Sequence, residues 1–236
     1  MKPTPTPIDR SATVAQIVAR HSETAAVFQK HRIDFCCRGD VTVAQALAGR
    51  QEDPEALFGE LEQAVLDRCV ERPEEDLLTL PTAALLARIV DRHHGYVRRA
   101  LPRVAPLLAK VAAVHGEHNP KLIPLRESFS ELADQLEPHL DFEEEILFPD
   151  LVRQDGPTAR TRAQLDDMAR EHLGVGAKLA QIRALADDYT TPPWGCSSYR
   201  ALIVELQALE TDVLQHVHLE NHVLMPRFAG QTSLLS

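Results

Sequence analysis

The sequence has no long apolar run and little of the basic or aromatic character of nucleic-acid-binding proteins. Aromatic residues make up 5% of its 236 residues, and 25 Lys and Arg stand against 35 Asp and Glu, a formal net charge of −10. Without a basic stripe to neutralise phosphates, a nucleic-acid surface is not expected. The apolar runs fall short of the roughly 20 residues of a membrane span, and the start, MKPTPTPIDRSATV, lacks a secretory signal's apolar stretch. We therefore expect no nucleic-acid or membrane partner and a cytoplasmic location.

Cysteine is also scarce, with four in the chain. In the cytoplasm cysteines stay reduced unless they bind metal or carry out redox chemistry. The adjacent pair Cys36 and Cys37 is unsuited to a structural disulfide. Arg32 and Arg38 flank the pair, and positive charge favours thiolate, so a redox or cluster-contact role is one hypothesis. The alternative is that both are small apolar residues of a helical domain.

Strand signals are few, and helical periodicity dominates, which predicts an all-α protein. Short helices are expected between about residues 10 and 70, interrupted by the loop IDFCCRGD. The charged stretch ERPEEDLLTLPT contains two prolines and predicts a boundary. We expect a small helical domain with the Cys-Cys loop over residues 1–72 and a second domain over residues 78–230.

Beyond this boundary lie four long amphipathic patterns with short to medium connections, which predict an antiparallel four-helix bundle. The first pattern should bend at Pro102 and Pro106. The four patterns cover about residues 82–115, 121–148, 158–188 and 198–225.

Two segments in these patterns share one template: HLDFEEEILFP, residues 139–149, and HVHLENHVLMP, residues 216–226. In each, Glu follows His by four residues, Leu follows Glu by four, and Pro comes two later. One His-x-x-x-Glu pair is weak evidence, but two in a shared frame are harder to dismiss. Positions i and i+4 lie on one helix face, so each pair can aim an imidazole and a carboxylate at one point. The prolines are expected to end both helices.

The other two helices can complete a site with His172 and either His93 or His94, between which spacing does not decide. Four imidazoles and two bridging carboxylates would make a two-metal site that suits iron, with manganese or zinc as alternatives. Ferritin-type bundles use Glu-x-x-His and are rich in carboxylates, whereas this pattern is rich in histidine.

The neighbouring polar residues have less specific expectations. Asp141, Glu144 and Glu145 are expected to form a solvated face or to orient a ligand imidazole through its other nitrogen. His218 and His222 are expected in solvent. The single cysteines Cys69 and Cys196 are expected to be buried and inert.

The chain from about residue 10 to 230 resembles the iron-sulfur cluster repair di-iron proteins, the RIC or YtfE/ScdA family, and its C-terminal part resembles their hemerythrin-like domain. The resemblance is carried by TVAQIVARHSETAAVFQKHRIDFCCRGDVTVAQAL, VAAVHGEHNPKL, HLDFEEEILFP, EHLGVG, CSSYRALI and HVHLENHVLMPR. The family's N-terminal signature is an Asp-aromatic-Cys-Cys-Gly-Gly run. Here Arg38 replaces the first Gly, and Arg32 stands where a Gly is usual, which puts a tight turn there in doubt.

The resemblance implies two non-haem iron ions bridged by two glutamates and an oxo or hydroxo group. It places the ligands at His94, His139, Glu143, His172, His216 and Glu220, with His115 as a further imidazole. It also implies repair of iron-sulfur clusters damaged by oxidative or nitrosative stress, with damaged iron-sulfur proteins as clients and iron donation as the means.

Two other functions use the same ligands. A di-iron oxidoreductase could reduce nitric oxide with Cys36 and Cys37 relaying electrons, which leaves enzymatic activity open. A hemerythrin-like sensor could bind O2 or NO reversibly, but such a carrier does not need a cysteine domain. A monomer and a homodimer remain alternatives.

Overall fold

The computed structural model describes residues 7–69, 77–153 and 158–228, and these residues contain helices and no β-strand, only an isolated bridge between Thr13 and Thr42. The all-α prediction is confirmed. The chain divides into two compact units, Met1–Leu85 with Leu214–Ser236, and Leu86–Val213. No described helix is long and apolar enough to cross a membrane.

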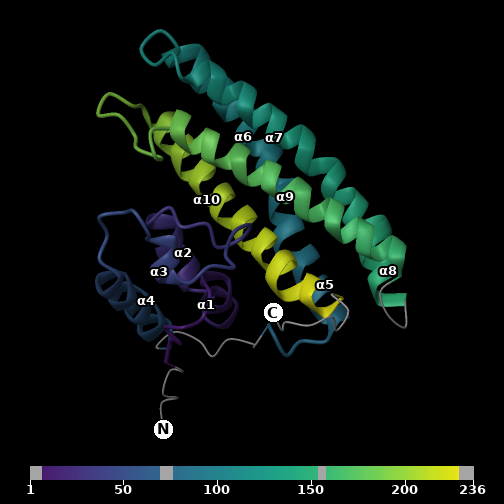
Figure 1. Cartoon of the computed structure of the whole chain (residues 1–236). Helices are drawn as coiled ribbons and strands as arrows, with labels where there is room; N and C mark the ends of the chain where they lie inside the picture. Colours follow the sequence, from purple (N-terminus) through teal and green to yellow (C-terminus); the bar gives the residue numbers. More distant parts are fainter. Residues whose placement is uncertain (1–6, 70–76, 154–157, 229–236) are drawn as a thin grey trace. The chain divides into compact units, whose positions relative to one another are not determined.

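The unit Leu86–Val213 is built on four long helices that run alongside one another (Figure 1). Most of their leucines and valines are buried, as the periodicity predicts, and Val114, Leu173 and Val204 are exposed. The helices are α6 (Gly95–His115), α7 (Leu122–Phe142), α9 (Ala159–Leu185) and α10 (Ser197–Leu219), the last of which continues into the other unit. Pro102 and Pro106 lie inside α6, which runs through both without a break.

Ion pairs between these helices show that neighbours run in opposite directions. Between α6 with its preceding turn and α10, Arg103 pairs with Glu205 and His93 with Asp212. Between α7 and α9, Lys178 pairs with Glu131 and His139 with Glu171. In both cases the residue numbers rise on one helix as they fall on the other. The antiparallel four-helix bundle predicted from the sequence is therefore present.

Three of the long helical segments contain a π-helical turn, which the sequence analysis did not predict. The turns are η1 (Ile89–His94), between α5 (Thr82–Arg88) and α6; η2 (Glu143–Leu147), between α7 and α8 (Phe148–Arg153); and η3 (Glu220–Leu224), between α10 and the 3-10 turn η4 (Met225–Arg227). π turns of this kind are frequent at functional sites because they insert an extra residue into one turn.

The repeated template coincides with two of these turns. In both copies the π turn begins at the Glu and ends at the Leu, and the Pro follows two residues later. Proline has no N–H to donate and crowds the carbonyl four residues earlier, so it disfavours a regular α turn at this point. The expectation that Pro149 ends its helix was wrong, because the chain continues as α8 to Arg153.

The unit Met1–Leu85 with Leu214–Ser236 contains the short helices α1 (Val14–Arg20), α2 (Thr24–Lys30) and α3 (Val43–Ala46) and the longer α4 (Pro54–Cys69). The sequence Thr-Val-Ala-Gln occurs at the start of both α1 and α3, and each Thr forms a capping box with the Gln three residues later. Phe28, Phe35 and Leu61 lie in the core of this unit.

The cysteine loop in this unit keeps a tight turn despite the arginine substitutions. Arg32 adopts a φ of 54°, the left-handed conformation in which glycine is usual. Arg50 holds this turn by donating to the carbonyls of His31 (2.7 Å) and Arg32 (3.0 Å). Gly39 allows a close approach, because a Cβ there would lie 2.6 Å from Phe35 O and 2.8 Å from Ala15 Cβ.

Candidate metal centre

All six ligands that the resemblance implies are buried. Glu143 and Glu220 have no exposed surface, although a carboxylate is among the side chains least often buried without a partner. Each lies one helical turn after an imidazole on its own helix. His139 Nε2 lies 3.2 Å from Glu143 Oε1, and His216 Nε2 lies 2.9 Å from Glu220 Oε1. The i, i+4 spacing therefore does aim imidazole and carboxylate at one another.

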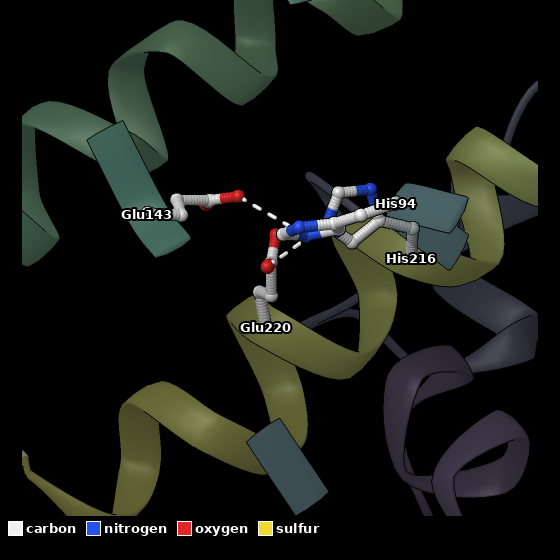
Figure 2. Close-up of side chains that lie close together, drawn as sticks. All are labelled: His94, Glu143, His216 and Glu220. Carbon is white, nitrogen blue, oxygen red and sulfur yellow. Dashed lines mark ion pairs between the residues drawn. The ribbon is translucent and has the colours of Figure 1, made fainter. Parts of the chain in front are cut away.

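The ligand atoms fall into two overlapping groups, each with atoms within 4.8 Å of one another. One group is His94, Glu143, His216 and Glu220, and the other is His139, Glu143, His172 and Glu220. Figure 2 shows the first group, with Glu143 and Glu220 reaching in from different helices toward the imidazoles of His94 and His216. Both groups contain both carboxylates.

The chemistry of the donor atoms also fits a cation. His139 Nε2 and His172 Nε2 face each other at 3.2 Å, and His94 Nε2 faces Glu143 Oε2 at 3.4 Å. Imidazole nitrogens and carboxylate oxygens converging on one buried point form a set of Lewis bases that a positive ion can share. The buried His and Glu cluster is a metal site.

Two of the imidazoles are oriented from outside the cluster. His94 Nδ1 donates to Glu144 Oε1 at 2.9 Å, and His139 Nδ1 donates to Glu171 Oε2 at 2.7 Å. A proton held on Nδ1 leaves the Nε2 lone pair pointing inward, the usual way in which a second carboxylate fixes a metal-binding histidine. Glu144 was expected either in such a position or on a solvated face, and the structure shows the former. Glu171 was missed, although it directly precedes His172 in the sequence.

His93 and His115 are not brought to this cluster. His93 is buried, but its Nδ1 donates to Asp212 Oδ1 at 3.0 Å, and the neighbouring His94 takes the inward position. His115 ends α6, 21 residues after His94 on one continuous run of helix, roughly 30 Å away at about 1.5 Å per residue. It contacts Cys196 instead. His115 is therefore too far from His94 to join this cluster.

The last turns of α10 and η3 contact the cysteine loop of the same unit. His218 Nδ1 donates to Phe35 O at 3.0 Å, and the side chains of Asn221 and His222 both donate to Cys36 O, at 2.8 and 3.0 Å. The expectation that His218 lies in solvent was wrong, because it is 2% exposed. Burial lowers its pKa to about 3, so the ring stays neutral and serves as a hydrogen-bond donor.

The two cysteines lie side by side on this loop. Cys36 is buried, and its Sγ lies 3.3 Å from Cys37 Sγ and 3.4 Å from Asp34 Oδ1. The hydrogen bond with Cys37, burial and the nearby charge of Asp34 all raise the pKa of the Cys36 thiol. The prediction that arginines favour a thiolate at Cys36 was therefore wrong. Asp34, Cys36 and Cys37 do form a small group whose atoms could together hold a metal ion.

The fold and the cluster define a class, a hemerythrin-like helical bundle with a buried cation site, and comparisons with known proteins agree. Residues 85–228 match the family model of the hemerythrin HHE cation-binding domain. Residues 10–65 match a second model, ScdA_N, a domain of unknown function. Together the two stretches contain the segments on which the resemblance to the YtfE/ScdA family rests.

Whole-chain relatives give the family. The iron-sulfur cluster repair protein ScdA of Staphylococcus haemolyticus is 30% identical over 94% of this chain and 100% of its own length. The iron-sulfur cluster repair protein YtfE of Citrobacter koseri is 31% identical over 94% of this chain and 99% of its own. The iron-sulfur cluster repair protein YtfE of Yersinia pseudotuberculosis is 30% identical over 92% of this chain and 96% of its own length. The chain belongs to this ScdA/YtfE family.

Proposed function

We propose that the buried cluster holds two iron ions and that the chain repairs iron-sulfur clusters damaged by oxidative or nitrosative stress. The observation that carries the proposal is the sharing of Glu143 and Glu220 by both ligand groups, each completed by two imidazoles. In this arrangement His94 and His216 would hold one ion, His139 and His172 would hold the other, and both carboxylates would be shared between the ions, together with an oxo or hydroxo group.

Iron held in this way supplies an ion that can be given to a client or can change its oxidation state. The residues of the chain fix how firmly it is held. Glu144 and Glu171 keep two imidazoles in the inward tautomer. The leucines of the repeat, Leu147 and Leu224, follow the two glutamates by four residues and are fully buried. Imidazole and carboxylate donors suit a free iron ion, whereas thiolate and sulfide suit the iron of a cluster, so the two sites would hold iron in different forms.

The names of the relatives support clients that are iron-sulfur proteins. We assign contact with the client, or electron transfer to it, to Cys36 and Cys37. Their thiols lie beside Asp34 in a group of possible metal ligands, and sulfur ligands suit the iron of a damaged cluster better than carboxylates do. The hydrogen bonds from Asn221 and His222 to Cys36 O join this loop to the turn that carries Glu220.

Metal content tests the proposed centre. Protein purified aerobically from iron-replete cells should contain two iron ions per chain and show an oxo-bridge charge-transfer band in the near ultraviolet. Glu143→Leu should lower the iron content toward one or zero. Glu145→Leu is the matched control, because Glu145 is exposed two residues away, and it should leave the iron content unchanged. One zinc ion per chain, or equal loss of iron in both variants, would overturn the di-iron centre.

A repair assay tests the function separately. A cluster enzyme damaged by nitric oxide is incubated with reductant and either the wild type or the double variant Cys36→Ala/Cys37→Ala. The wild type should restore activity, and the double variant should keep its iron but fail to do so. Full repair by the double variant would remove the cysteines from the function. Steady consumption of nitric oxide by the wild type without repair would favour the oxidoreductase.

A further inference from the structure

A second group of reactive side chains lies at the opposite end of α6 from the metal cluster. His115 ends α6, and its Nε2 lies 3.2 Å from Sγ of Cys196, the residue that precedes α10. Cys196 was expected to be buried and inert, but it is exposed. The pair lies within the unit Leu86–Val213, in which Cys196 is the only cysteine of the sequence. Nothing in the proposed repair function uses it.

The backbone places Cys196 at the start of a long helix. Its carbonyl accepts from Arg200 N at 3.0 Å, the first hydrogen bond of α10. Backbone hydrogen bonds from Ser198 and Tyr199 reach the Cys196 thiol. The N-terminus of a helix stabilises negative charge because its free N–H groups and its dipole point at the residue there. Cys196 Sγ therefore has three donors around it, one imidazole and two amides.

The loop before Cys196 is shaped to bring it to His115. Gly195 N donates to Pro192 O at 2.8 Å, and a Cβ at Gly195 would lie 2.9 Å from Thr191 Cγ2. Only glycine fits this turn without displacing the loop.

Aromatic rings hold the imidazole in place. The His115 ring packs against Trp194 with centroids 5.6 Å apart and against Tyr199 at 5.8 Å. Tyr199 is itself fixed by a hydrogen bond from Asn119 Nδ2 at 2.9 Å. Rings at these separations attract one another beyond the burial of their surface. The imidazole is thus positioned beside the sulfur before any reagent arrives.

We propose that Cys196 is a nucleophilic thiolate that exchanges with low-molecular-weight disulfides, with the His115 imidazole as its hydrogen-bonding partner. The thiolate attacks one sulfur of R–S–S–R, the Cys196–S–S–R bond forms, the original S–S bond breaks, and R–S⁻ leaves. One disulfide is consumed and one is formed, so no further oxidant is needed. Because the unit Leu86–Val213 holds no other cysteine, no thiol of this unit resolves the mixed disulfide, and an external thiol can remove it.

The charge distribution supports this assignment. The hydrogen bond from His115 and the backbone amide of Tyr199 lower the pKa of Cys196 to about 7. An ordinary cysteine has a pKa of about 8.5, so Cys196 holds about fifteenfold more thiolate at pH 7. A thiolate of lower pKa is also a weaker nucleophile, and this offsets about fivefold of the gain. The net expectation is a rate about 3-fold above that of an ordinary thiol at pH 7.

The test is the reaction of the full chain with 4,4′-dithiodipyridine, a neutral disulfide whose released thiopyridone absorbs light. The rate should be half-maximal near pH 7, and mass spectrometry of the peptides should find the first label on Cys196. His115→Phe keeps a ring between Trp194 and Tyr199 but removes the N–H. It should move the midpoint toward pH 8.5 and lower the rate at pH 7 about 3-fold. Cys196→Ser should abolish the fast phase.

The matched control is His118→Phe, because His118 also contacts Trp194, with centroids 5.9 Å apart, and lies three residues from His115. It should leave the midpoint near pH 7. A wild-type midpoint of 8.5 or above, an equal midpoint in His115→Phe, or a first label on Cys37 would each overturn the proposal. Circular dichroism checks that the variants fold, and if His115→Phe does not, the wild-type midpoint and the labelled residue decide.

Discussion

The carboxylates that hold the outer nitrogens of the ligand imidazoles allow a graded test of the metal centre. Glu144 accepts from His94 Nδ1 and also from Arg98, at 3.1 Å. Although burial acts against it, the hydrogen bonds from His94 and Arg98 lower the pKa of Glu144, so it stays charged at neutral pH. Replacing Glu144 by Gln keeps an oxygen that can accept from Nδ1 but removes the charge that strengthens the imidazole as a ligand.

The expected loss of metal affinity depends on how exposed the carboxylates of Glu144 and Glu171 are. Loss of such an outer partner typically lowers metal affinity 10- to 100-fold, and Gln should fall at the lower end, about 10-fold or about 1.4 kcal/mol. The Glu171 side chain is 60% exposed against 30% for Glu144. Water can therefore replace much of the hydrogen bonding that the Glu171 carboxylate gives to His139. Glu171→Gln should lower the metal affinity about 3-fold or less.

The assay is a titration of the iron-loaded protein with a chelator, in which the concentration that removes half of the iron is compared between variants. Glu145→Gln is the control, because it makes the same change of charge on the exposed neighbour of Glu144. The expected order of iron retention is Glu145→Gln equal to the wild type, then Glu171→Gln, then Glu144→Gln. Equal effects of Glu144→Gln and Glu145→Gln would show that net charge matters and the hydrogen bond to His94 does not.

Two further predictions concern stability and use paired variants in urea unfolding. Gly39→Ala should lower the free energy of unfolding by about 1–3 kcal/mol, because its Cβ would meet Phe35 O, whereas Gly59→Ala, with open space inside α4, should raise it by about 0.5–1 kcal/mol. Arg183→Met should cost about 3 kcal/mol because it leaves the buried Glu210 without its guanidinium. Lys121→Met, which breaks an exposed pair with Asp187, should change stability by less than about 1 kcal/mol.

The sequence predicts the bundle well because the same periodicity that makes a helix amphipathic also decides which face is buried. The four predicted helical segments agree with the structure to within a few residues, and the i, i+4 pairs His139 with Glu143 and His216 with Glu220 do face one another. These are local features, fixed by helix geometry alone.

Features that depend on contacts between distant segments could not be predicted. The position of His218 in the helical pattern predicts an exposed side chain. In the structure it is buried and bonds to the carbonyl of Phe35, which lies 183 residues earlier in the sequence. In the same way Cys196 looks like an ordinary small residue until His115, 81 residues earlier, is placed beside it. Spacing alone did not decide between His93 and His94; the resemblance favoured His94, and in the structure Asp212 binds the His93 imidazole outside the cluster.

The repeated template shows where local and tertiary information meet. Its His and Glu keep α-helical spacing, so both point toward the cluster, and the π turn starts only at the Glu. The extra residue of that turn shifts the phase of everything after it without moving the ligands. Leu147 and Leu224, which end the two π turns, are fully buried. The Pro two residues later lacks the N–H that a regular helix would use, so the widened turn costs less there than elsewhere. The template thus encodes a buried His and Glu pair and the irregular helix that follows it.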